Sequence, residues 1–177
     1  MSEYLAFEPQ VEVLGAAIMS VSAGLGDRAI PILEKHNLYP LHRDQWYKQQ
    51  DWLDAFKELS RRSMLDLLAI GMKIPDEAAW PPDVNDVHSA LASVDIAYHM
   101  NHRNGEIGHY EYHKIGEYNG IMVCNNPYPS DFDQGIVYGT ARKFCSNPAS
   151  VRVMLDNKEP SRKQGAESCT YTIRWSE

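Results

Sequence analysis

The sequence predicts an α+β domain in which N-terminal helices pack on a small antiparallel sheet. Apolar residues recur at helical spacing through most of residues 11–104. Beyond them, the side chains of Ile107–Ile115 and Ser168–Trp175 alternate between two faces. In the second segment one face is mostly apolar and aromatic and the other is polar, as in half-buried strands. Because the helices precede the strands instead of alternating with them, we expect an antiparallel sheet that is backed by helices.

Five helices are expected in the first half, each bounded by capping or helix-breaking residues. Asp27, Asp51 and Ser63 can cap the second, third and fourth helices, and Gly71 closes the fourth. The predicted helices are Val11–Ala23, Asp27 to about Asn37, one that starts at Asp51, one from Ser63 to Gly71, and the longest from Asp83 or Asn85 to about Arg103.

The sheet is predicted from turn signals between apolar segments. Tyr118-Asn119-Gly120 is typical of a hairpin turn, so Ile107–Ile115 should pair antiparallel with Ile121–Cys124. Two further strands, Val151–Leu155 and Ser168–Trp175, are joined by a polar segment and complete the expected sheet of four strands.

A strand, a turn and a helix follow one another from Ile121 to Phe144. Ser130 is the expected N-cap of this helix, and the acidic residues just after it suit the positive end of a helix dipole. Gly135 and Gly139 lie one turn apart, where small residues let a helix lie close against a neighbour. We therefore expect this helix to pack tightly inside the domain.

Length and composition limit the classes of protein that the chain can represent. Its 177 residues fit one domain, 1–177, with a helical part at about 11–104 and a sheet-containing part at about 105–177. The formal net charge of -7 opposes general attraction to nucleic acids or anionic membranes. No apolar run approaches the roughly 20 residues of a membrane span, and the N-terminus lacks the features of a secretory signal. A cytoplasmic protein with no nucleic-acid partner and no membrane span is expected.

Cysteine and basic residues suggest no special chemistry. The three cysteines are too few and too scattered for a disulfide framework, so we expect buried thiols. The basic segment Lys158–Lys163 is expected to form a solvated turn.

Four polar residues form the sharpest constellation in the chain. His88, Asp95, His99 and His102 lie at offsets of seven, four and three along the longest helix, which places them on one narrow stripe. Imidazoles and a carboxylate can converge on one metal ion, and His109, Glu111 and His113 of the next strand could add ligands. The alternative is a solvated helix flank.

Catalytic motifs are lacking in the sequence. There is no nucleophile elbow, no phosphate-binding glycine loop and no pair of catalytic carboxylates, which favours a binding domain over an enzyme. Apolar and aromatic side chains on the fourth helix, the longest helix and the sheet could line a ligand pocket. The candidates are Leu67, Leu91, Tyr98, Tyr112, Met122, Phe132 and Trp175.

The second half of the chain resembles a known family. The motifs are Asn125-Asn126-Pro127 after a strand, Asp133-Gln-Gly135-Ile-Val-Tyr-Gly139 in a helix, and Gly165-Ala-Glu167-Ser-Cys169-Thr-Tyr171-Thr-Ile173 near the end. From roughly Leu91 to Trp175 the chain resembles 4-vinyl reductase-type small-molecule-binding domains, which share a fold with haem-nitric oxide binding domains and with subunits of Golgi transport complexes. The resemblance implies a ligand pocket between the sheet and the long helices, dimerisation, and a role in sensing.

The family's cofactor motifs are changed in this chain. Of the zinc ligands near the final hairpin only Cys169 has a counterpart, since Ser161 and Lys158 stand where a second thiol and an acid would be needed. The haem relatives hold propionates with a Tyr-x-Ser-x-Arg run, and here that run is Tyr128-Pro129-Ser130-Asp131-Phe132. An apolar Phe132 cannot hold a carboxylate, although a histidine ligand could come from the longest helix. The cofactor is therefore unknown from sequence, and a metal remains possible.

These observations favour a standalone sensory domain that binds a small, apolar or hydrocarbon-like molecule and acts through a downstream protein partner. One alternative is a metal- or haem-binding protein that uses the histidines of the longest helix, and another is a structural adaptor without a ligand. A homodimer through the N-terminal helices is also expected, because they carry two apolar stripes. The stripes are Leu14, Ala17, Ile18 and Val21, followed by Ala29, Ile30 and Leu33.

Overall fold

The structure is a computed structural model that describes residues 3–77, 80 and 82–177. It confirms the predicted α+β class. The elements in chain order are β1 (Glu12–Leu14), α1 (Gly15–Ile18), α2 (Ser20–Leu25), the 3-10 helix η1 (Gly26–Ala29), α3 (Ile30–Lys35), β2 (Trp46–Lys48), α4 (Gln49–Arg62), α5 (Met64–Glu77), α6 (Val87–Ala92), α7 (Val94–Met100), β3 (His102–Arg103), β4 (His109–Gly116), β5 (Asn119–Asn125), α8 (Ser130–Phe144), η2 (Pro148–Ser150), β6 (Arg152–Leu155), η3 (Arg162–Gln164) and β7 (Cys169–Arg174).

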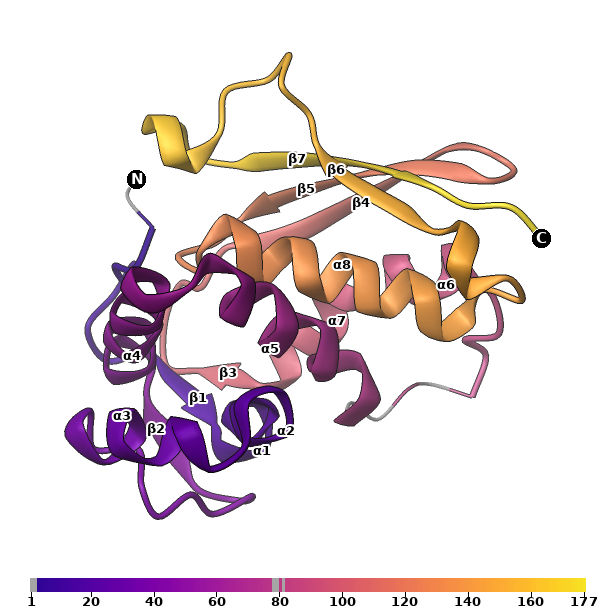
Figure 1. Ribbon diagram of the computed structural model, residues 1–177. Coiled ribbons are helices and arrows are strands. Elements are labelled where there is room, and N and C mark those ends of the chain that lie inside the picture. Colours follow the sequence, from indigo (N-terminus) through magenta and orange to yellow (C-terminus); the bar gives the residue numbers. More distant parts are fainter. Residues whose placement is uncertain (1–2, 78–79, 81) are drawn as a thin grey trace.

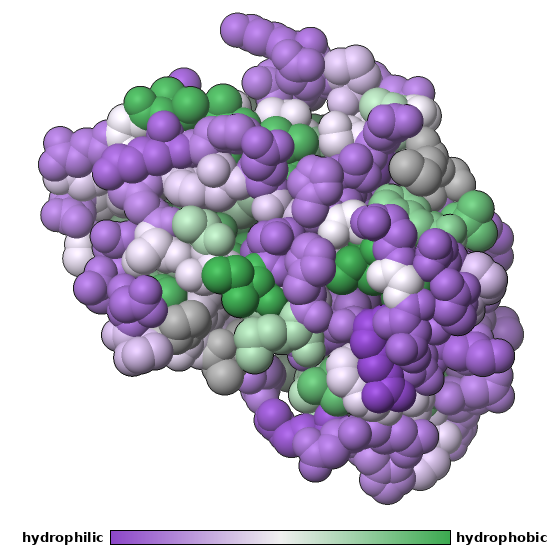
Figure 2. Space-filling model, turned by 180° about the vertical axis from the view of Figure 1, so that it is seen from behind, coloured by the Kyte–Doolittle hydropathy of each residue, from purple (hydrophilic) through white to green (hydrophobic). Residues whose placement is uncertain are grey.

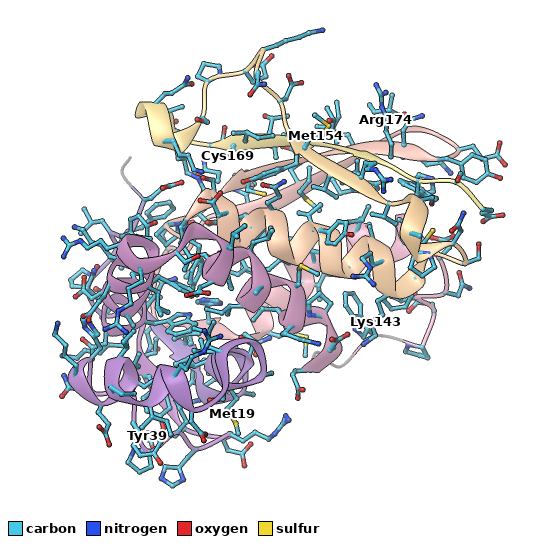
Figure 3. The ribbon with its side chains drawn as sticks, in the orientation of Figure 1. Met19, Tyr39, Lys143, Met154, Cys169 and Arg174 are labelled. Atoms are coloured by element: carbon cyan, nitrogen blue, oxygen red, sulfur yellow. The ribbon has the colours of Figure 1, made fainter. Side chains whose placement is uncertain are left out.

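The larger sheet has the strand order β4-β5-β7-β6, and each neighbouring pair is antiparallel. The predicted hairpin of β4 and β5 is confirmed, with Tyr112 opposite Met122. Helix α8 lies along one face of this sheet, and α5 lies beyond α8 (Figure 1). Side chains alternate accordingly, since Cys169 points toward α8 while Met154 and Arg174 point away from the helices (Figure 3).

A second, three-stranded sheet lies on the far side of α8 from the larger sheet, with the order β2-β1-β3 (Figure 1). It corrects the predicted helix from Val11, because β1 replaces the start of that helix. Val11 and Val13 are both 1% exposed. The alternation of buried and half-buried residues in β1, together with its pairing to both β2 and β3, decides in favour of a strand.

The longest predicted helix is divided into α6 and α7 and ends at Met100, not near Arg103. Ser93 lies at the division, and its hydroxyl donates to the Ser89 carbonyl oxygen over 2.8 Å. Such a bond from a serine to the preceding turn competes with the helical ladder and bends helices. The residues after the helix, His102 and Arg103, instead pair with β1.

Helices α5 and α8 cross at very short range through three glycines, as expected for Gly135 and Gly139. A Cβ atom on Gly139 would lie 2.6 Å from the Met72 carbonyl oxygen, and one on Gly135 would lie 2.9 Å from the Gly71 Cα atom. The prediction that Gly71 closes the fourth helix is wrong, because α5 continues to Glu77. Gly71 is needed for the crossing instead, since its own Cβ would collide with the Phe132 carbonyl oxygen.

The N-terminal helices contribute to the core of the subunit. Ile18, Val21, Ala29 and Leu33 of the predicted dimer stripes are no more than 1% exposed within the single chain. The segment Gly15–Lys35, with a mean hydropathy of 1.2, is long and apolar enough to cross a membrane by length and composition alone. Core helices of globular domains and N-terminal signal sequences pass the same test. Of the apolar stretch in this segment 39% is buried, including Ile18, Val21 and Leu33, which pack in the core. Seen from behind, the surface is largely hydrophilic, and its hydrophobic side chains form separate patches (Figure 2).

Replacing Gly135 with Ala should destabilise the fold, because the new methyl group meets backbone atoms of α5 that cannot rotate away. Overpacking of this kind costs about 1 to 3 kcal/mol. Urea unfolding followed by circular dichroism measures the change. Arg142→Ala, on the exposed side of the same helix, is the control and should shift stability by no more than about 0.5 kcal/mol. Equal stability of the two variants would contradict the close crossing.

Candidate functional site

A cavity of about 70 Å³ lies between α5, α7, α8 and the N-terminal elements. Its wall is almost entirely apolar and aromatic, and none of the described lining residues is an aspartate, glutamate, lysine or arginine. The lining residues are Val13, Ala17, Trp52, Ile74, Pro75, Trp80, Val94, Ala97, Tyr98, Asn101, His102, Tyr110, Tyr128, Phe132, Ile136 and Thr140. Pockets of this composition bind small apolar molecules and orient them with a few polar groups.

His102 is the principal polar group of the wall. Its Nδ1 lies 2.8 Å from the Tyr98 carbonyl oxygen, which can only accept, so Nδ1 carries the hydrogen. Nε2 then accepts from the Tyr128 hydroxyl over 2.7 Å. Burial lowers the pKa of His102 from 6.5 to about 4, so the ring is neutral at pH 7. This tautomer has its lone pair on Nε2, the arrangement in which histidine ligates metals.

Three tyrosines of the cavity wall donate hydrogen bonds from their hydroxyl groups to partners inside the protein. Tyr98 donates to the Ile107 carbonyl oxygen over 2.5 Å, and Tyr110 donates to Asp133 Oδ1 over 2.6 Å. The ring centroids of Tyr98 and Tyr110 are 5.1 Å apart in an edge-to-face arrangement. Burial raises the pKa of Tyr98, Tyr110 and Tyr128. All three hydroxyls are therefore protonated at neutral pH.

Behind Tyr110 lies a buried ion pair between Asp133 of α8 and Arg162 of η3, whose side chains are 0% and 1% exposed. Arg162 also donates to the side chain of Asn126 over 2.6 Å and to the Cys169 sulfur over 3.4 Å. Burial raises the pKa of Asp133, and the guanidinium opposes that shift. The prediction of a solvated turn at Lys158–Lys163 is wrong for Arg162, because its charge is matched in the core.

The seven predicted pocket residues fall into three groups. Tyr98 and Phe132 line the cavity. Leu67, Leu91 and Met122 are no more than 1% exposed and belong to the core beside it. Tyr112 and Trp175 lie elsewhere, against His88: the Tyr112 hydroxyl is 2.6 Å from His88 Nδ1, and the Trp175 ring packs edge-on to the imidazole.

The predicted metal ligands are not brought together. His88 contacts Tyr112 and the Glu117 carbonyl oxygen, whereas His102 faces Tyr128. Asp95 and His99 do approach each other, with 3.5 Å between Oδ2 and Nδ1. Within residues 3–77, 80 and 82–177 no group of three His, Cys, Asp or Glu side chains could hold a metal ion. Fourteen residues of helix span about 21 Å, so His88 and His102 share a stripe without sharing a site.

The strand residues proposed as additional ligands are also apart from this stripe. His113 Nε2 lies 3.2 Å from Glu111 Oε1, and both side chains are exposed on β4. His109 is exposed on the same strand. Glu111 and His113 thus form an exposed pair, and His109 lies on the surface of the same strand.

Sequence reasoning missed several residues of the cavity wall. The sequence places Tyr128 only in a cofactor motif and assigns no role to Trp80 or Thr140, although all three line the cavity. The available signal was three tyrosines, Tyr98, Tyr110 and Tyr128, whose rings pack together in the structure, with Tyr98 and Tyr128 also against His102.

The architecture is that of the H-NOX fold, the fold of haem-nitric oxide binding domains. An H-NOX protein from S. oneidensis in the Fe(II) ligation state matches with a TM-score of 0.71 and 15% identity, over 93% of this chain and 96% of that one. An H-NOX protein mutant from K. algicida matches with a TM-score of 0.63 and 16% identity, over 93% and 97% of the two chains. An oxygen-binding H-NOX domain related to soluble guanylate cyclases matches with a TM-score of 0.64 and 12% identity, over 92% and 93%.

At the level of sequence there is no such match. No protein-family model matches the chain, and no curated protein does. The resemblance to haem-nitric oxide binding domains is thus confirmed as a likeness of fold.

The side chains in the cavity do not fit a haem. Cofactor pockets usually measure about 300 to 1,000 Å³, whereas this cavity has about 70 Å³. Phe132 lines the wall, and the described lining residues include no cation that could neutralise a propionate. The Tyr128 hydroxyl also donates a hydrogen bond to His102 Nε2, so the lone pair of this nitrogen is already used. His102 itself has a suitable tautomer, but its surroundings leave no space for a porphyrin.

The neutral His102 should make stability depend on pH. Because the unfolded chain binds a proton at about pH 6.5 and the folded chain only at about pH 4, stability falls as the pH drops from 6.5 toward 4. The loss between pH 7 and pH 5 should be about 2 kcal/mol. Urea unfolding of the wild type and of His102→Met at both pH values measures it. The variant should lack this component, and an equal pH dependence of both proteins would refute the neutral buried imidazole.

Proposed function

We propose that this chain is a binding domain, with a sensory role, for a small and largely apolar molecule. The observation that carries the proposal is the uncharged cavity between α5, α7 and α8, with a neutral His102 in its wall. The H-NOX fold of the chain supports it, since the solved structures with this fold include domains that bind oxygen and nitric oxide. The lack of a catalytic motif supports binding rather than catalysis.

The size of the cavity limits the ligand. A cavity of about 150 Å³ holds the six carbons of benzene, so about 70 Å³ holds about three or four non-hydrogen atoms. The best very small ligands gain about 1.5 kcal/mol per atom, so the tightest possible dissociation constant is about 0.5 mM for three atoms and about 0.04 mM for four. A larger or tighter ligand requires side chains of the wall to move apart.

Filling the cavity should abolish binding. Ala97→Leu adds three carbons at the wall, about the volume that the cavity holds. Titration with 1-propanol, followed by NMR shifts of backbone amides, should give saturable changes around the cavity in the wild type. The affinity should fall at least tenfold in Ala97→Leu. Ala92→Leu, which makes the same change at an exposed position of α6, should bind as the wild type does.

Two results would refute the proposal. One is a wild type that shows no saturable shift with either 1-propanol or n-butane. The other is an unchanged affinity in a folded Ala97→Leu variant, which would place the bound probe elsewhere.

Haem binding is a second candidate, and the lone pair on His102 Nε2 is the observation that favours it. It requires Tyr128 to release Nε2 and the cavity to widen several-fold. Addition of haemin to the purified protein tests it by absorption spectroscopy. A stoichiometric Soret band that is lost in His102→Ala would establish haem binding in place of the leading proposal. Free-haemin spectra in both proteins would exclude it.

Assembly and location are further parts of the proposal. A sensory role implies a downstream protein partner, and we retain a homodimer through the N-terminal helices and a cytoplasmic location as hypotheses. Since Ile18, Val21 and Leu33 are buried within the subunit, a dimer would have to use the outer side of these helices, where Met19 is 38% exposed. Sedimentation as a monomer at tens of micromolar would contradict the dimer.

A further inference from the structure

Thr140 is a polar residue of the cavity wall that the fold leaves unsatisfied. It is 0% exposed and lines the cavity from α8. Its hydroxyl has no hydrogen-bond partner among the residues that the structure describes. A buried threonine in a helix ordinarily bonds the carbonyl of the preceding turn, and buried polar groups are nearly always paired. The hydroxyl is therefore unpaired within the described residues but closed to a water-sized molecule, so a bound molecule reaches it only when the Thr140 side chain rotates toward the cavity.

His102 and Tyr128, by contrast, already satisfy each other. Thr140 lies two helical turns after Phe132, a rise of about 12 Å along α8. Phe132 packs on Tyr128, with 5.3 Å between ring centroids. The satisfied pair and the unsatisfied hydroxyl thus occupy different parts of the wall.

A second buried polar side chain lies behind the satisfied pair. Gln49, the first residue of α4, is 0% exposed. The amide lies near the hydroxyls of Tyr98 and Tyr128 and opposes the rise in their pKa.

The buried charges beside the cavity are paired with each other. Asp133 is paired with Arg162 behind Tyr110, so neither offers a counter-charge to a ligand. The exposed Lys143 donates to the carbonyl oxygen of Pro75 over 2.7 Å. A cation that entered the cavity would lose its hydration and find no carboxylate among the described lining residues, which is strongly unfavourable. A neutral hydroxyl or carbonyl would lose less and could pair with Thr140.

We propose, resting on the proposed function, that the cavity selects an uncharged molecule that carries one hydrogen-bonding group, such as a short alcohol, and that Thr140 Oγ1 pairs with this group. Thr140 is then the residue that distinguishes the ligand from a hydrocarbon of equal size. The apolar wall around it holds the remaining carbons.

Three probes with four non-hydrogen atoms in a line separate these contributions. They are 1-propanol, n-butane and propylammonium, which differ only in the terminal group. Each is titrated by NMR into the wild type, Thr140→Val and Thr140→Ser. Thr140→Val replaces the hydroxyl with a methyl group of similar size, so it removes an unsatisfied buried group and should fold. Thr140→Ser retains the hydroxyl.

In the wild type 1-propanol and n-butane should bind, and propylammonium should not. The ratio of the dissociation constants of 1-propanol and n-butane should rise about tenfold in Thr140→Val, the effect expected of one lost hydrogen bond. Thr140→Ser should keep the wild-type ratio. Because the measure is a ratio, a general change in the cavity affects both probes and cancels.

The failures of the two proposals are distinguishable. If the neutral probes bind but the ratio is unchanged in Thr140→Val, the role of Thr140 is refuted and the binding function stands. If propylammonium binds as tightly as 1-propanol, the selection for uncharged ligands is refuted. If neither neutral probe binds the wild type, the proposed function fails, and this inference fails with it.

Discussion

The close crossing of α5 and α8 is the contact on which the interior depends. Three glycines bring the two backbones together, with a Gly135 Cβ position only 2.9 Å from the Gly71 Cα atom. Helix α8 can then place Phe132, Ile136 and Thr140 in the wall of the cavity while its other side supports the larger sheet. The distance between α5 and α8 therefore sets the volume of the cavity. A wider crossing would leave a larger cavity and weaker packing.

Tyr110 lies between the uncharged cavity and a buried ion pair. On one side its ring lines the uncharged cavity, and on the other its hydroxyl donates to Asp133 of the buried ion pair. The pair joins the first turn of α8 to η3, a segment that lies between β6 and β7. The charges are thereby separated from the cavity by a single aromatic ring. This arrangement keeps the cavity neutral while a charged network fixes the start of the helix.

Local patterns were sufficient for the class of fold, the β4-β5 hairpin and helix α8. These elements carry strong local signals, namely the period-two alternation and the glycine spacing of α8. The hairpin turn itself lies at Glu117 and Tyr118, because the predicted turn residues Asn119 and Gly120 already pair within β5. The errors arose where tertiary contacts decide. Val13 lies in a strand because β2 and β3 flank it, and Arg162 is buried because Asp133, 29 residues earlier, neutralises it. The cavity wall draws on residues from Val13 to Thr140, and no periodicity within one element could have collected them.

The buried pair of Asp133 and Arg162 also restricts how this sequence can evolve. Removing either partner alone leaves an unmatched charge in the core, at a typical cost of about 3 to 5 kcal/mol. That is a large part of the roughly 5 to 15 kcal/mol by which most domains are stable. Replacing both with apolar residues together can be neutral or even stabilising. Among descendants of this sequence, the two positions should therefore change together, because each single substitution removes a large part of the stability until the other accompanies it.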